Sequence, residues 1–346
     1  MKKILATIAI LSMGYGLKTE AKLSFAPSMM GIQAGIQSMK GLNNPMITPS
    51  FHNIGTDIIY GDDDRYEVDD YPNKSFRELA KSVAGMVKSR HLSDDIGDPT
   101  LMNFVKRTSE DKFELCEEEP FAKQYTLPIC SGFLIAPDTL VTAGHCIEDQ
   151  SDCENFKWVF EFKKGTTKIK KENVYSCKKI HERVLKESRF KLKDYAVIQL
   201  DRPATGRTPL KFRRKKKARV GTKLVVIGHP SGLPMKITDN GKIQRLNKTE
   251  IKRPISSLFK RRYYFNANLD TYSGNSGSPV FNRKTKLVEG VLVQGGDDYV
   301  RNIDMFCNES NRLSDSRWVS EESVFRITKV PFIKDIQNKY LKSLEK

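Results

Sequence analysis

Three short polar motifs, far apart along the chain, constrain its fold more than any other feature. They read Thr-Ala-Gly-His-Cys at 142–146, Asp-Tyr-Ala-Val-Ile-Gln-Leu at 194–200 and Gly-Asn-Ser-Gly-Ser-Pro at 274–279. His145 precedes Asp194 by 49 residues, and Asp194 precedes Ser276 by 82 residues. Each interval is long enough for several β-strands. We therefore expect that only a tertiary fold brings these three side chains together.

The three residue types suit nucleophilic catalysis. The Ser276 hydroxyl needs a base within hydrogen-bond reach, which His145 can provide, and Asp194 can hold the imidazole in the useful tautomer. The N–H groups of Gly274 and Ser276 are expected to form an oxyanion hole, and Gly277 leaves room for substrate beside the backbone. Each residue alone also has a structural explanation. In this order and these contexts, the three together favour catalysis.

The motifs carry a resemblance to a known family. Residues 130–146 are similar to the histidine segment of chymotrypsin-like (trypsin-fold) serine endopeptidases, and 194–200 to their aspartate motif. Residues 274–282 resemble the serine motif of the bacterial glutamyl-endopeptidase branch. The segment 58–65 is similar to the mature N-terminus of the same branch. The resemblance implies a serine endopeptidase that forms an acyl-enzyme on polypeptide substrates and needs no cofactor and no metal.

The same resemblance implies an all-β fold of two packed, antiparallel, six-stranded barrels, with the catalytic cleft between them. Short apolar runs separated by turn residues agree with strands. Residues 330–345 have apolar positions at helical spacing, which predicts a terminal helix packed on the second barrel. The expected divisions are a signal peptide at 1–21, a propeptide or flexible arm at 22–57, and a protease domain at 58–346. Within that domain we expect the first barrel at about 76–200, the second barrel at about 205–328 and the helix at about 330–345.

Two positions depart from the family pattern. Digestive members have Asp before the catalytic serine, where it pairs with the new N-terminus after activation, whereas this chain has Asn275. A zymogen, if one is made, is therefore not expected to use that ion pair. The glutamyl branch carries a His on the strand lining the specificity pocket, and the matching stretch 290–296 contains none.

Asp270 lies six residues before Ser276, at the position where trypsin-like enzymes place the carboxylate that binds Lys or Arg. A carboxylate at the base of a pocket pairs well with guanidinium. Cleavage after Arg or Lys is therefore one expectation, with Thr271, Gln294 and Gly295 as further substrate-binding residues. The structural alternative is that Asp270 caps a turn with Thr271.

Six cysteines fit an oxidising compartment and allow 15 pairings, which the sequence does not settle. The family resemblance implies a bond between Cys130 and Cys146. The suggested pairs for the others are Cys153–Cys177 and Cys116–Cys307. Metal binding is the alternative, but the chain has no CxxC pair.

The N-terminus has two lysines followed by about ten mostly apolar residues, which is typical of a secretory signal peptide and too short for a membrane span. Cleavage near Gly16 or Ala21 is expected. The mature protein is then secreted or periplasmic, without a membrane anchor, and most simply a monomer.

The formal net charge is +17, with basic runs at 207–219 and 242–262. Such runs suit solvated loops or contacts with polyanions. The alternative function is therefore an inactive protease-fold protein that binds polyanions through its basic surface. Nucleic acid is not an expected partner, because no supporting fold motif is visible. A periplasmic quality-control protease is a third reading, but it would be expected to add a peptide-binding domain.

Overall fold

Most of the chain's short apolar runs become β-strands that are buried on both faces. In a computed structural model of the protein, the described residues are 59–188, 191–244, 263–295, 298–313 and 322–345. The expected signal peptide, the propeptide and the main part of the basic run 242–262 lie outside these residues. No helix among the described residues has the length and apolar character needed to cross a bilayer.

The first half of the domain is a closed barrel with strand order β10-β11-β7-β6-β3-β8, in which all the pairings are antiparallel. Large apolar side chains such as Phe133, Trp158 and Tyr195 fill it. The strands are β3 (Val83–Lys88), β6 (Cys130–Ala136), β7 (Thr139–Thr142), β8 (Phe156–Phe160), β10 (Val174–Ser188) and β11 (Lys191–Leu200).

The second half is an eight-stranded sheet with order β14-β15-β21-β17-β16-β12-β13-β2. Backbone hydrogen bonds of Ile243 with Gly221 and Thr222 also join β14 to the chain that enters β12. The strands are β2 (Arg65–Glu67), β12 (Leu224–Gly228), β13 (Lys236–Thr238), β14 (Ile243–Gln244), β15 (Tyr264–Ala267), β16 (Pro279–Asn282), β17 (Val288–Gln294) and β21 (Glu322–Arg326). The predicted all-β fold is confirmed, with β13 and β2 added at one edge of this sheet.

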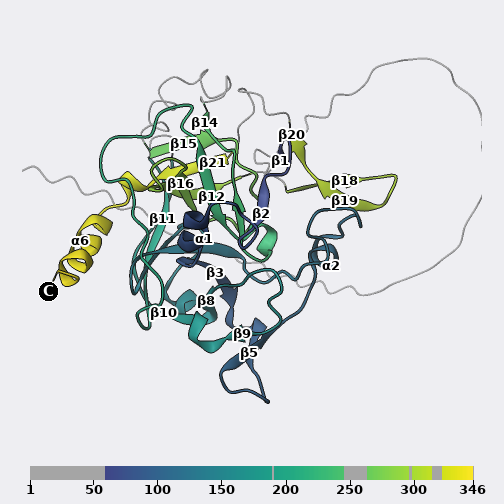
Figure 1. The fold of residues 1–346 in the computed structure, drawn as a ribbon, viewed down its shortest axis with the longest axis horizontal. Helices are drawn as coiled ribbons and strands as arrows, with labels where there is room; N and C mark the ends of the chain where they lie inside the picture. The colour runs from purple at the N-terminus through teal and green to yellow at the C-terminus, as the bar shows by residue number, and fades with distance from the viewer. Residues whose placement is uncertain (1–58, 189–190, 245–262, 296–297, 314–321, 346) are drawn as a thin grey trace, which may run out of the picture. The chain divides into compact units, whose positions relative to one another are not determined.

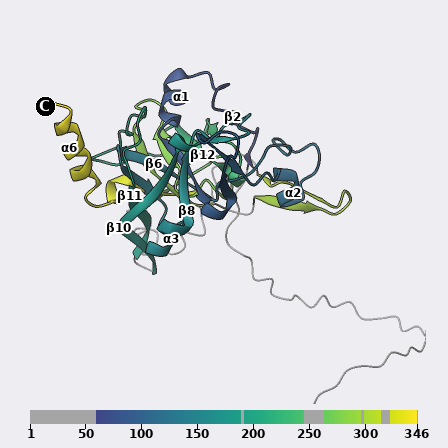
Figure 2. The same cartoon turned by 90° about the horizontal axis from the view of Figure 1, so that it is seen from below.

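Short strands and helices flank the two halves (Figures 1 and 2). The hairpin β18–β19 lies beside α2 in both views. The remaining strands are β1 (Ile59–Tyr60) with β20 (Arg312–Leu313), β18 (Tyr299–Asn302) with β19 (Cys307–Ser310), and β4 (Leu92–Asp94), β5 (Leu101–Phe104) and β9 (Ile169–Lys170). The helices are α1 (Lys74–Ala80), α2 (Ser109–Phe113), α3 (Gln150–Asn155) and α6 (Ile333–Ser343), with short 3-10 turns at 89–91, 171–173, 230–232 and 327–329.

The terminal helix α6 exists as predicted, but its packing differs from the prediction. It contacts β6, a strand of the first barrel. The amide of Gln337, which is buried, donates to the carbonyls of Ile135 at 3.3 Å and Leu210 at 3.0 Å. Helical spacing predicts an apolar face but not the surface that covers it. Here the buried Gln337 within that face binds a carbonyl of β6 and a carbonyl of the segment that follows the first barrel.

Three disulfides join the suggested cysteine pairs, Cys116–Cys307, Cys130–Cys146 and Cys153–Cys177. The Cys116–Cys307 bond closes a span of 191 residues, whereas the Cys153–Cys177 bond closes only 24.

Because the entropy lost by the unfolded chain grows with loop length, we expect the double variant Cys116→Ser/Cys307→Ser to lose about 5 kcal/mol of unfolding free energy. The matched double variant at Cys153 and Cys177 should lose about 3 kcal/mol. Guanidinium unfolding of both variants measures the difference, and equal losses would contradict this ranking.

Candidate active site

His145 lies in the turn that follows β7, and β11 runs beside that strand. The antiparallel register pairs Thr142 with Ala196, which brings Asp194 alongside the turn. Gly144 is needed at this crossing, because a Cβ there would lie 2.4 Å from the Val184 carbonyl oxygen. Strand pairing thus removes the 49-residue separation between His145 and Asp194.

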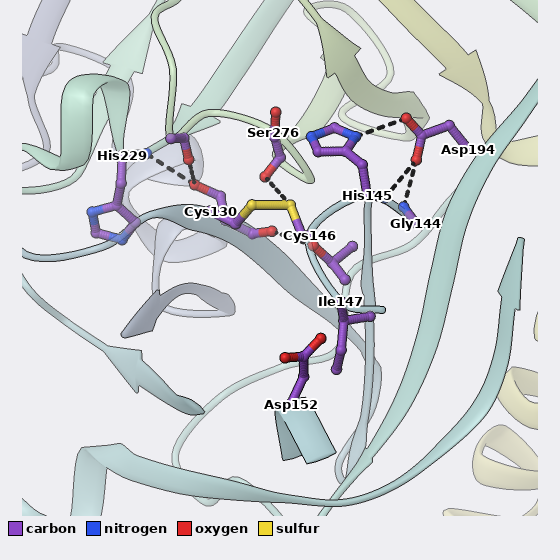
Figure 3. The surroundings of a disulfide bond; sticks show 12 residues. Cys130, Gly144, His145, Cys146, Ile147, Asp152, Asp194, His229 and Ser276 are labelled. Atoms are coloured by element: carbon purple, nitrogen blue, oxygen red, sulfur yellow. Dashed lines mark hydrogen bonds and ion pairs between the residues drawn. A yellow bond between two sulfur atoms is a disulfide. The ribbon is translucent and has the colours of Figure 1, made fainter. Parts of the chain in front are cut away.

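Asp194 makes two hydrogen bonds to His145 and one to the preceding Gly144 (Figure 3). Its Oδ2 lies 2.8 Å from Nδ1 of His145, and its Oδ1 accepts the backbone N–H groups of Gly144 at 2.5 Å and His145 at 3.1 Å. The carboxylate is 9% exposed. A carboxylate can only accept, so Nδ1 carries the hydrogen and Nε2 of the neutral ring keeps its lone pair for another proton.

Ser276 lies in the loop between β15 and β16. Figure 3 draws it next to the His145 ring, on the side away from Asp194. Its carbonyl accepts the N–H of Ser131 at 2.8 Å, and Cys146 Sγ lies 3.6 Å from the same oxygen. The sulfur carries no hydrogen because it is in a disulfide, so this second approach is a contact and not a hydrogen bond. These anchors hold the Ser276 backbone against the segment that carries His145.

The loop around Ser276 leaves two backbone donors unused. Of the N–H groups from residue 273 to 278, four donate to protein acceptors. The other two, those of Gly274 and Ser276, have no acceptor among the described residues. Gly274 and Gly277 have φ angles of 94° and 90°, a region that favours glycine. The predicted oxyanion donors are therefore the two N–H groups of this loop that remain free to bind an external oxygen.

Asp270 is buried, and both of its carboxylate oxygens accept backbone N–H groups. Oδ1 binds the N–H of Tyr60 and Oδ2 that of Asp64, each at 2.8 Å. Burial raises the pKa of Asp270 to about 7. The described residues supply no cation to pair with it. The Asp270 carboxylate therefore anchors the segment that contains β1, a role that the sequence did not suggest.

The other predicted substrate-binding residues have different surroundings. Thr271 is buried, and its hydroxyl donates to Glu322 at 2.8 Å. Gln294 is exposed at the end of β17, and Gly295 follows it. The same strand accepts the N–H of Gly277 at Leu292. Gln294 and Gly295 therefore extend from a strand bonded to the nucleophile loop, and their contact with substrate stays a prediction.

One group of three metal-ligand side chains occurs among the described residues, and it comprises Cys130, His145 and Cys146. Both cysteines are joined in a disulfide, which removes the thiolates that a metal would require. The proximity of these three residues reflects the disulfide beside the histidine turn.

His229 is a buried histidine in the turn after β12. It is fully buried, its Nδ1 lies 2.9 Å from the Leu233 carbonyl, and its Nε2 has no partner among the described residues. Burial lowers the pKa of His229 to about 4. This ring therefore stays neutral at ordinary pH. We assign it a structural role, because it is buried and binds the Leu233 carbonyl.

The buried ring predicts a pH dependence of stability. Between pH 6.5 and about 4 the unfolded His229 binds a proton that the folded one does not, so its contribution is complete above pH 6.5 and declines as pH falls. The loss at pH 4 is on the order of 3 kcal/mol. We expect the stability difference between wild type and His229→Gln, measured by guanidinium unfolding, to shrink from pH 7 to pH 4.5. A constant difference would contradict this assignment.

Part of the chain is similar to a known protein family. Residues 130–289 match the family profile described as trypsin-like peptidase domain. No curated protein matches the chain significantly. Among solved structures, a Glu endopeptidase in complex with MPD is 15% identical, with a TM-score of 0.45 over 82% of this chain and 100% of that one. The Vibrio cholerae VesB protease is 13% identical, with a TM-score of 0.46 over 82% and 67%. Rv3671c from M. tuberculosis H37Rv, as an inactive Ser-to-Ala mutant, is 14% identical, with a TM-score of 0.39 over 82% and 97%.

Proposed function

We propose that this chain, whose residues 130–289 match the trypsin-like peptidase domain profile, is an exported serine endopeptidase with the triad Ser276, His145 and Asp194. One observation carries the proposal. The two unused N–H groups of Gly274 and Ser276 belong to the loop of a serine whose backbone is held beside a carboxylate-bound histidine. These two donors can bind the oxyanion that forms when Ser276 attacks a carbonyl.

The proposed reaction uses each group in turn. The Ser276 hydroxyl attacks the peptide carbonyl while Nε2 of His145 takes its proton. The tetrahedral oxyanion accepts the N–H groups of Gly274 and Ser276. The imidazolium, stabilised by Asp194, then gives its proton to the departing amine, which leaves an acyl-enzyme. Water, deprotonated by the same histidine, hydrolyses the ester and restores Ser276.

The primary specificity is a separate part of the proposal. A preference for Arg or Lys before the cut is supported by the buried Asp270 carboxylate, to which no described cation is paired. Its two bonds to the backbone N–H groups of Tyr60 and Asp64 favour the anchoring role instead. Cleavage of a proteome-derived peptide library, read by mass spectrometry, decides between them. Enrichment of Arg and Lys that disappears in Asp270→Asn supports substrate binding, whereas cleavage without that enrichment assigns Asp270 to the anchor alone.

Export is supported by the N-terminal sequence and by the three disulfides, which suit an oxidising compartment. We propose that the protein acts on polypeptides outside the cytoplasm as a monomer, without a cofactor.

A fluorophosphonate probe tests the function against the alternative of an inactive polyanion-binding protein. We expect one adduct per molecule of the purified, naturally processed chain, mapped to Ser276 by peptide mass spectrometry. The wild type should also hydrolyse casein. Absence of both labelling and hydrolysis would reject the endopeptidase and favour the polyanion-binding alternative.

A further inference from the structure

The nucleophile loop is held in place by a buried serine from the first barrel. Ser131 on β6 is fully buried, and its hydroxyl lies 2.8 Å from the Gly274 carbonyl and 3.1 Å from the backbone nitrogen of His229. The His229 N–H can only donate, so the hydroxyl accepts there and directs its own hydrogen to Gly274. The orientation of this hydroxyl is thereby fixed.

Ser131 also reaches the nucleophile through its backbone, because its N–H donates to the Ser276 carbonyl at 2.8 Å. One residue therefore holds the carbonyls of Gly274 and Ser276. These are the two residues whose N–H groups remain free. A Cβ on Gly277, the residue after Ser276, would lie 2.0 Å from the Ser131 carbonyl oxygen, which shows how closely the two segments approach.

A second set of bonds holds the same loop from the other side. The carboxylate of Asp298, just before the hairpin β18–β19, accepts the Ser273 N–H at 2.9 and 3.1 Å. The Ser273 carbonyl accepts the N–H of Ser231 at 2.5 Å, and the Ser231 hydroxyl lies 2.8 Å from that of Tyr299. In a trans peptide the carbonyl and the N–H point in opposite directions. Fixing the Ser273 carbonyl therefore fixes the opposite direction for the Gly274 N–H.

These bonds matter because Gly274 has no side chain to restrict its backbone. A glycine at φ of 94° can rotate its neighbouring peptides at little cost, which would turn an oxyanion donor away from the substrate. Such a rotation would break the bonds to Ser131 and Ser231. Donors that are already oriented need no rearrangement when charge develops in the transition state.

We infer that Ser131 and Asp298 are positioning residues that restrict rotation of the backbone around Gly274 and Ser276, so that the N–H groups of these two residues stay turned toward the oxyanion before substrate binds. The inference rests on the proposed endopeptidase activity. Neither residue has a part in bond breaking, and Ser131 is fully buried, so their effect should be confined to stabilising the tetrahedral state.

The test compares binding of two ligands to Ser131→Ala and Asp298→Ala. A peptide aldehyde forms a tetrahedral adduct with Ser276, whereas the product peptide acid resembles the ground state. We expect kcat to fall about 10- to 100-fold with KM changed less than threefold, because removing a whole donor costs 10²–10³ in kcat. The Ki of the aldehyde should rise by the same factor, and that of the product should stay constant. Asp298→Asn, which keeps an acceptor oxygen, should recover most of the activity.

Ser82→Ala is the matched control. Ser82 is also a buried serine of the first half, and its hydroxyl donates to the Thr208 carbonyl at 2.7 Å. It should lower the melting temperature as Ser131→Ala does but leave kcat and the aldehyde Ki unchanged. If Ser131→Ala does not fold, Asp298→Ala alone carries the test. Values of kcat within twofold of wild type, or a loss of kcat without weaker aldehyde binding, would overturn the inference. Failure of the wild type to react with the fluorophosphonate probe would instead reject the proposed function.

Discussion

Replacing Ser276 with Ala is expected to lower kcat on casein-derived peptides by about 10⁶-fold and to abolish fluorophosphonate labelling. The hydroxyl is the only group proposed to bond covalently to substrate, and loss of the nucleophile in a triad costs about that factor. What remains is the catalysis provided by the oxyanion donors and by substrate binding, about 10³–10⁴ over water. Steady-state kinetics with a fluorogenic peptide, at enzyme concentrations fixed by absorbance, measures the decrease.

Ser93→Ala serves as the control for this variant, since Ser93 is an exposed serine on β4, away from the triad. It should keep wild-type kcat and labelling. Circular dichroism should show that both variants fold. A Ser276→Ala enzyme that retains more than a hundredth of the wild-type kcat would assign the nucleophile to another residue.

Asp194→Asn is expected to lower kcat near neutral pH by about 10⁴-fold while leaving the fold intact. The amide oxygen can still accept the N–H groups of Gly144 and His145, which now bind Oδ1. The amide nitrogen would then face Nδ1 of His145 and donate to it. The ring would carry its hydrogen on Nε2, the atom that must take the proton from Ser276.

The melting temperature separates this cause from general damage to the fold. Because the defect lies in the tautomer, the melting temperature should change little while kcat collapses. Asp201→Asn is the control, because Asp201 follows the same strand and also accepts a backbone N–H, that of Ser176 at 3.1 Å. Equal losses of kcat in the two variants would show that the Asp194 carboxylate has no specific role in orienting His145.

Local motifs were enough to predict the fold class and the pairing of His145 with Asp194. The two motifs lie on neighbouring strands, β7 and β11, whose register pairs Thr142 with Ala196. The contacts of α6 could not be predicted, because its spacing identifies an apolar face and Gln337 decides where that face lies. The surroundings of Asp270 were equally hidden, since its partners Tyr60 and Asp64 lie about 200 residues earlier in the chain.

The residues that support the nucleophile loop also lay beyond the reach of the sequence. Ser131 is an ordinary strand residue beside a cysteine, and its bond to Gly274 spans 143 positions. Asp298 stands in a polar stretch that resembles a solvated loop. Their contacts depend on the packing of two halves of the molecule against one loop. Short motifs report the residues that react, while the residues that orient them emerge only when the fold is complete.

The Cys116–Cys307 bond gives the hairpin a dependence on the redox state of its surroundings. One end of this hairpin is tied by the sulfurs, and the other begins next to Asp298, which holds Ser273. In a thiol-rich cytoplasm the Cys116–Cys307 disulfide would be reduced. The hairpin would then hold Asp298, and through it Ser273, less firmly. For the proposed exported endopeptidase, newly made molecules would therefore hydrolyse their neighbours poorly until oxidation closed the bond. Comparing turnover before and after mild dithiothreitol treatment, with Cys116→Ser/Cys307→Ser as the reference, measures this self-restraint.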